Sequence, residues 1–256
     1  MNKNQLALIR LHFIEYANRY ISNAGNMRPM MELKRVHCAF VAKNCRQLAV
    51  SNGWKNSEVY TAEAIGLLHD VGRFPQLEEF GTFRDDLSIN HGERGWQAIQ
   101  ESGLLDELAP DLRDVILNSV RYHNVRIIPD NLPKEHYRWI ELIRDADRLD
   151  IYRVVLDALE NKKYEAHPDI LLNLPPDREP SPLIVDLVQQ KHPPAYSDLT
   201  CVADFLLVLL SWSYQMNYSA TLEIMKERKI IERLAAHLPQ NNPKINAILS
   251  TLLPPK

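Results

Sequence analysis

Residues 67–73 read LLHDVGR, and the His69-Asp70 pair inside this stretch guides the interpretation of the whole chain. The pair belongs to an ordered series of four histidines and two aspartates. The series consists of His37, His69, Asp70, His91, His123 and Asp147. Neutral imidazoles suit borderline transition metals, and one carboxylate can bridge two ions. The series therefore predicts a two-metal site, provided that the fold brings its members together.

The chain around this pair has helical periodicity. Strand-type alternation is scarce, and only 8 glycines are present. We expect helices over residues 6–20, 33–48, 57–69, 111–123, 134–160, 183–190, 198–218, 220–238 and 245–253, and one that begins at Asn90. Residues 74–88 contain Pro75, Gly81 and several charges, and are expected to form a loop. The pattern predicts an all-α protein of eight to ten helices.

Helical spacing also places the candidate ligands on inward faces. Residues three and four apart share a face, so His37, His123 and Asp147 each lie on an apolar stripe. Asp145 lies about 200° around the helix from Asp147, and we therefore choose Asp147. A buried, unpaired carboxylate costs several kcal/mol, so Asp147 needs a cation or a network of partners. A metal ion would serve, and the alternative partners are Arg121, Arg144 and Arg148.

Composition narrows the class of protein. The chain has 256 residues, 45 % of them hydrophobic, with a formal net charge of −3. A charge so close to zero argues against general binding to nucleic-acid polymers or anionic membranes. The 3 cysteines contain no Cys-x-x-Cys pair, which excludes a disulfide framework and a zinc–thiolate site. No signal peptide or membrane span is evident, so we expect a cytoplasmic protein.

Domain organisation follows from a change of character near residue 165. We expect a single domain over 1–256, with its core at about 30–155. Prolines cluster over 165–196, which predicts a Pro-rich insertion enclosing one short helix. A C-terminal helical extension is expected over 198–256.

The motifs resemble those of the HD superfamily of metal-dependent phosphohydrolases, which are all-helical. The resemblance rests on His37, HDVGR at 69–73, NHG at 90–92, YHN at 122–124 and DADRLD at 145–150. It implies that His37, His69, Asp70 and Asp147 hold a first metal ion. It further implies that His91 and His123 hold a second ion, with Asp70 bridging the two. Iron and manganese are the preferred metals, and cobalt, nickel and zinc are further candidates.

The resemblance implies hydrolysis of a phosphate ester or anhydride, and we expect a nucleotide or related small metabolite as substrate. Two divalent ions lower the pKa of a bridging water, and the resulting hydroxide attacks phosphorus. Asp70 and Arg73 are the expected catalytic residues. Arg73 would grip the phosphate as a bidentate fork, with Arg94 and Arg121 as further candidates for phosphate binding. Asp150 would orient a ligand imidazole or cap an arginine.

Two other functions fit the same residues. A branch of the superfamily uses a similar ligand set to hold two irons and to cleave C–C or C–P bonds with dioxygen. The residues by which those oxygenases grip their substrates are not recognised around 27–35. A non-catalytic helical module that binds a nucleotide or a protein is the third function considered, and the complete ligand set argues against it.

Overall fold

The computed structural model describes residues 1–252, and in that range the chain is helical with no strand. The predicted all-α class is confirmed. The chain divides into two compact units, Met1–Asp150 and Ile151–Lys256, and each is described by itself. The expected single domain, with its insertion and extension, stays a prediction. None of the helices within 1–252 is both long and apolar enough to cross a membrane.

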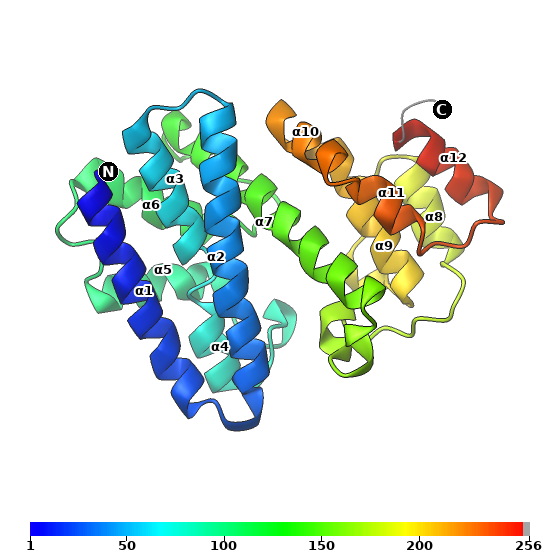
Figure 1. Cartoon of the computed structure of the whole chain (residues 1–256), viewed down its shortest axis with the longest axis horizontal. Coiled ribbons are helices and arrows are strands. Elements are labelled where there is room, and N and C mark those ends of the chain that lie inside the picture. The colour runs from blue at the N-terminus through cyan, green and yellow to red at the C-terminus, as the bar shows by residue number, and fades with distance from the viewer. Residues whose placement is uncertain (253–256) are drawn as a thin grey trace. The chain divides into compact units, whose positions relative to one another are not determined.

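The first unit contains the HD stretch and its neighbours. Its helices are α1 (Lys3–Asn23), α2 (Arg28–Ser51), α3 (Asn56–Leu68), α4 (Arg73–Phe80), α5 (His91–Ser102) and α6 (Pro110–Tyr122), followed by the start of α7 (Lys134–Glu160). Helix α2 packs against α1 and α3, and α5 packs against α4 and α6 (Figure 1). The side chains of α2, α3 and α7 that face inward are almost entirely buried. This packing surrounds the turn that carries His69 and Asp70.

A small residue sets the distance between α2 and α3. A Cβ atom at Gly66 would lie 2.7 Å from Ala42 Cα and 2.8 Å from Cys45 Sγ. Real Cβ atoms do not approach backbone so closely, so only glycine permits this contact. The close packing brings His37 on α2 near His69, which caps the end of α3.

Helix α4 corrects the expectation of a loop over 74–88. Pro75 lies in its first turn, where a missing N–H costs nothing because helix starts leave those groups unpaired. Gly81 ends the helix in the left-handed conformation, with φ of 67°. Proline and glycine, which the sequence interpretation treats as breakers, are here the start and stop signals of a short helix. The irregular segment is therefore limited to residues 81–90, and a short 3-10 helix, η2 (Asp85–Leu87), lies within it.

The second unit is built around α9 (Val202–Ser211), in which every residue is buried. Helix α8 (Pro182–Gln189) packs against α9 and against α12 (Pro243–Leu252). The buried carboxylate of Asp204 accepts hydrogen bonds from the backbone N–H groups of Ser181 and Thr200, at 2.7 and 2.9 Å. These bonds fasten the Pro-rich stretch to α9, so its helix belongs to the core of this unit.

The last predicted helices are shorter than expected. The stretch 198–218 contains α9 and then a 3-10 helix, η6 (Trp212–Gln215). The stretch 220–238 is divided into α10 (Ser219–Glu227) and α11 (Ile230–Ala235) by Lys229, whose φ is 50°. Neither break carries a glycine or proline, so the apolar periodicity continues across both and predicts single helices. Counting these pieces and α4, residues 1–252 contain α1 to α12, more helices than expected.

Candidate metal centre

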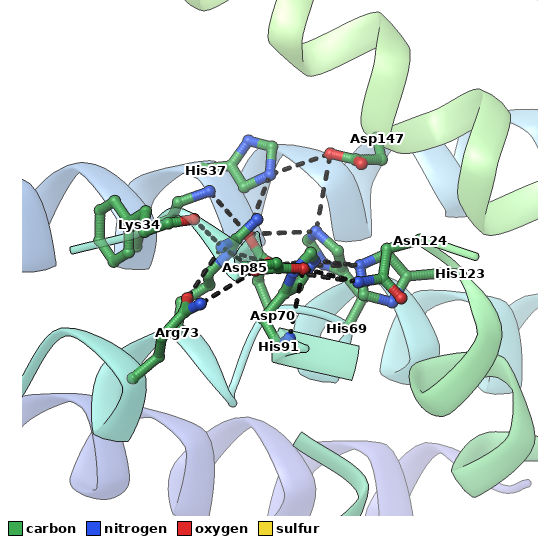
Figure 2. Close-up of polar contacts among 12 residues, drawn as sticks. Lys34, His37, His69, Asp70, Arg73, Asp85, His91, His123, Asn124 and Asp147 are labelled. Atoms are coloured by element: carbon green, nitrogen blue, oxygen red, sulfur yellow. Dashed lines mark hydrogen bonds and ion pairs between the residues drawn. The ribbon is translucent and has the colours of Figure 1, made fainter. Parts of the chain in front are cut away.

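The fold brings all six residues of the series together in the first unit (Figure 2). They come from α2, the turn after α3, the first residue of α5, the end of α6 and the middle of α7. Two groups of three form, each with ligand atoms within 4.8 Å of one another, and they share Asp70. One group consists of His37, His69 and Asp70. The other consists of Asp70, His91 and His123.

The two oxygens of Asp70 face different pairs of histidines. Its Oδ2 lies 3.6 Å from His37 Nε2 and 3.7 Å from His69 Nε2. Its Oδ1 lies 3.5 Å from His91 Nε2 and 3.9 Å from His123 Nε2. A carboxylate in this position can give one oxygen to each of two ions. The geometry therefore fits a bridging aspartate between two metal positions.

Asp147 adds a second carboxylate to the His37 side of the centre. Its Oδ1 lies 3.1 Å from His37 Nε2 and 3.7 Å from His69 Nε2. One position is thus surrounded by two histidines and two carboxylates, and the other by two histidines and Asp70 alone. Burial raises the pKa of Asp147, but its contact with His37 and the nearby His69 imidazole outweigh burial and hold the pKa well below its usual range.

Each of the four imidazoles is held through its Nδ1 atom. The acceptors are Asp150 for His37 at 2.7 Å, the Gly66 carbonyl for His69 at 2.8 Å, Asp85 for His91 at 2.7 Å and the Val120 carbonyl for His123 at 2.7 Å. A carbonyl or carboxylate oxygen only accepts, so each Nδ1 donates its proton outward. The four Nε2 atoms are left to point toward Asp70. Metal-bound histidines are oriented in this way by a partner on their other nitrogen.

The Nε2 atoms of His91 and His123 lie only 3.0 Å apart. Burial lowers the pKa of both groups, and that of His123 falls to about 3, so both rings are neutral at pH 7. With each ring proton on Nδ1, two lone pairs face each other, and a cation between them would relieve the repulsion. The Nε2 of His69 is likewise buried without a hydrogen-bond partner. These orphaned nitrogens fit a transition-metal centre.

His37 differs from the other three histidines. Burial lowers its pKa, but hydrogen bonds to Asp147 and Asp150 outweigh burial and raise the pKa to about 9. His37 is therefore protonated at pH 7 without metal, and its Nε2 proton goes to Asp147. A metal ion at this position would have to replace that proton.

Asp85 is a side chain beside the six-residue group that the sequence interpretation missed. It lies in the irregular segment 81–90, and its Oδ2 accepts from His91 Nδ1 at 2.7 Å and from Asn124 Nδ2 at 3.1 Å. Its Oδ1 accepts from Arg73 and from Gln76, each at 2.9 Å. No local signal separates Asp85 from its exposed neighbour Asp86, because its partners come from other helices.

Lys34 was also missed, although a signal for it exists. It lies one helical turn before His37 on α2, which places both side chains on one face. Its Nζ is 2.8 Å from Asp70 Oδ2. Burial raises the pKa of Asp70, while Lys34, His69 and Arg73 outweigh burial and keep that pKa well below its usual range.

The three predicted phosphate-binding arginines lie in different surroundings. Arg73 Nε is 3.5 Å from Asp70 Oδ1, so this guanidinium borders the centre. Arg94 pairs with Glu79 at 3.0 Å and with Glu101 at 3.3 Å. Arg121 pairs with Glu93 at 2.6 Å and lies over the Trp96 ring. The structure therefore joins Arg73 to the six-residue group and gives Arg94 and Arg121 other partners.

Comparison with known proteins gives one positive finding. Residues 36–162 match the HD domain family. The matched range contains all six residues of the series. The searches of curated proteins and of solved structures gave no match.

Proposed function

Since the chain contains an HD domain, we propose that it is a metal-dependent phosphohydrolase that cleaves a phosphate ester or anhydride. The family match supports membership of a superfamily rich in metal-dependent phosphohydrolases. We propose a nucleotide or a related small phosphorylated metabolite as substrate. The cytoplasmic setting remains part of this proposal.

The single observation that carries the proposal is the position of Asp70. Each of its oxygens faces a different pair of histidine Nε2 atoms, and the Nδ1 atom of each of these rings donates its proton to an acceptor outside the series. A purely structural histidine cluster would pair its nitrogens, since buried unsatisfied polar groups are costly. Two divalent ions held by such a set lower the pKa of bound water and neutralise phosphoryl oxygens.

The chain's own residues would hold the ions and orient the ligands. His37, His69, Asp70 and Asp147 would hold one ion, and Asp70, His91 and His123 the other. Asp150 and Asp85 accept the Nδ1 protons of His37 and His91, which orients both rings with Nε2 toward Asp70. Imidazole-rich sites with carboxylates favour iron or manganese over magnesium, and cobalt, nickel and zinc are also compatible.

The test is metal quantitation followed by a phosphate-release screen over nucleotides and sugar phosphates. We expect phosphate release from the wild-type protein and at least a 100-fold loss in Asp70→Ala, on the order of a missing metal ligand's effect. Asp86→Ala is the matched control, because this exposed carboxylate pairs with Arg84 outside the centre. Unchanged release in Asp70→Ala would refute the proposal. Substrate-dependent oxygen uptake coupled to turnover would favour a di-iron oxygenase instead.

A further inference from the structure

Lys34 connects the buried centre with the protein surface. Its Nζ lies 2.8 Å from Asp70 Oδ2, and its side chain is 20 % exposed, whereas that of Asp70 is only 3 % exposed. The same ammonium lies 5.3 Å from the centroid of the Phe83 ring, in the segment 81–90. Lys34 is thus a cation beside the reaction centre that can reach solvent without disturbing the fold of α2.

Arg73, the expected phosphate clamp, is held more firmly than Lys34. Its Nη1 donates to the Gln76 side chain, to the Phe83 carbonyl and to Asp85 Oδ1. These three acceptors fasten Arg73 to the segment that carries Asp85. Moving Arg73 toward a substrate would therefore break these three hydrogen bonds and remove one of the donors that hold Asp85, the acceptor of the His91 Nδ1 proton.

Lys34 can move at a much lower cost. Within residues 1–252, Asp70 is the one acceptor that the structure gives its ammonium. A lysine side chain is flexible and carries three rotatable donors, which suits it to follow an anion. Release of Lys34 from Asp70 breaks one hydrogen bond and leaves the Arg73–Asp85–His91 connection intact.

The charge of the centre changes when Asp70 acts as a bridge. Asp70 attracts Lys34 as long as the negative charge on Asp70 Oδ2 is not neutralised by a metal ion. If Asp70 held two divalent ions, that attraction would weaken and the charge of the ions would repel the Lys34 ammonium. A phosphoryl group at the centre would supply the anion that Lys34 has lost.

From this geometry we propose that Lys34 binds a phosphoryl oxygen of the substrate, and that its contact with Asp70 belongs to the state without substrate. The inference rests on the proposed phosphohydrolase function, whose substrate carries the phosphate. It assigns to Lys34 the substrate contact that the sequence interpretation assigned to Arg73. Arg73 then acts as a positioning residue for Asp85 and His91.

The test measures orthophosphate binding to the manganese-loaded protein by isothermal titration calorimetry. Lys34→Met removes the charge at similar volume and should weaken orthophosphate binding about tenfold, the effect of one charge-assisted hydrogen bond. Lys34→Arg keeps the charge and should retain most of the affinity. Lys43→Met, at an exposed position of the same helix, is the matched control and should bind like the wild type. Manganese content should be the same in all four proteins.

Three results would overturn the assignment. Orthophosphate binding by Lys34→Met at wild-type affinity would show that Lys34 does not touch the phosphate. Loss of manganese from Lys34→Met would show that Lys34 supports Asp70 as a ligand. A wild-type protein that binds no orthophosphate would contradict the assignment as well.

The proposed function can fail separately from this assignment. Absence of phosphate release from every ester, together with Lys34-dependent orthophosphate binding, would contradict hydrolysis and support the role of Lys34. Phosphate release together with orthophosphate binding that is independent of Lys34 would overturn the role of Lys34 alone.

Discussion

At the scale of single residues, two histidines of the candidate centre are oriented by carboxylates outside the six-residue series. Asp85 holds His91 through Nδ1, and Asp150 holds His37 in the same way. Only one of these two carboxylates could be identified from the sequence. Asp150 lies one turn after Asp147 and was considered from helical spacing as a residue that orients an imidazole. Asp85 lies among charged residues of an irregular segment, where sequence spacing does not indicate which way a side chain points.

Replacement of Asp85 should weaken one half of the centre and spare the other. Asp85→Asn removes the charge that orients His91, so manganese affinity at the His91–His123 position should fall about 10–100-fold. The affinity of the His37–Asp147 position should be unchanged. Equilibrium dialysis against manganese measures both. Asp86→Asn, whose side chain is 63 % exposed, should match the wild type. Two equally tight sites in Asp85→Asn would contradict the role of Asp85.

The raised pKa of His37 predicts a pH-dependent metal affinity. His37 has a pKa of about 9 in the metal-free protein, above its ordinary value of about 6.5. The protonated ring stabilises the metal-free fold below about pH 6.5, and this contribution is lost as the pH rises through about 9. Metal must displace the proton, so affinity should rise with pH up to about 9.

Calorimetry of manganese binding in buffers of different ionisation heat tests the role of His37. At pH 7.5 we expect release of about one proton from His37 on binding, falling toward zero above the pKa of about 9. An affinity that is constant from pH 7 to pH 9 would show that His37 is neutral before metal binds.

At the scale of elements, close approach of helices brings the ligands together, and Gly72 is the tightest point. A Cβ atom there would lie 2.2 Å from His91 O and 2.4 Å from Gly95 N, both in the backbone of α5. Backbone cannot move aside as a flexible side chain can. The backbone at Gly72, two residues after Asp70, is therefore in direct contact with α5, the helix that carries His91.

Gly72→Ala should destabilise the protein and displace His91. Overpacking of this kind costs about 1–3 kcal/mol in the free energy of unfolding, which urea denaturation measures. Manganese content should fall toward one ion per chain, since His91 moves with α5. Gly95→Ala makes a smaller overlap at the same contact and should cost less, because its Cβ would lie 3.1 Å from the Val120 side chain and 3.3 Å from Gly72 N. Wild-type stability and metal content in Gly72→Ala would contradict the close packing.

Sequence periodicity predicts the ends of some helices and not of others. The 27 residues of α7 were predicted with their ends, since apolar residues recur from one end to the other and Pro133 precedes the helix. Helix α4 was missed because Pro75 and Gly81 were taken as breakers, although each is favourable at a helix end. The break at Lys229 could not be predicted, because no glycine or proline marks the position at which the chain turns left-handed.

At the scale of the whole molecule, metal binding should be coupled to stability. Ligands that bind only the folded state stabilise it, by about 2.7 kcal/mol at a hundred times the dissociation constant of one site. Treatment with a chelator should therefore lower the melting temperature of the manganese-loaded protein, as measured by scanning calorimetry. Asp70→Ala should melt at the same temperature with and without chelator. If the wild-type protein melts at the same temperature with and without chelator, that result would argue against a resident metal.

The central claim is that Asp70 lies between two metal positions. Anomalous diffraction at the manganese edge, on crystals of the loaded protein, tests it most directly. We predict two peaks, one beside Asp70 Oδ2 among His37, His69 and Asp147, and one beside Asp70 Oδ1 among His91 and His123. A single peak, or peaks away from Asp70, would contradict the dinuclear centre.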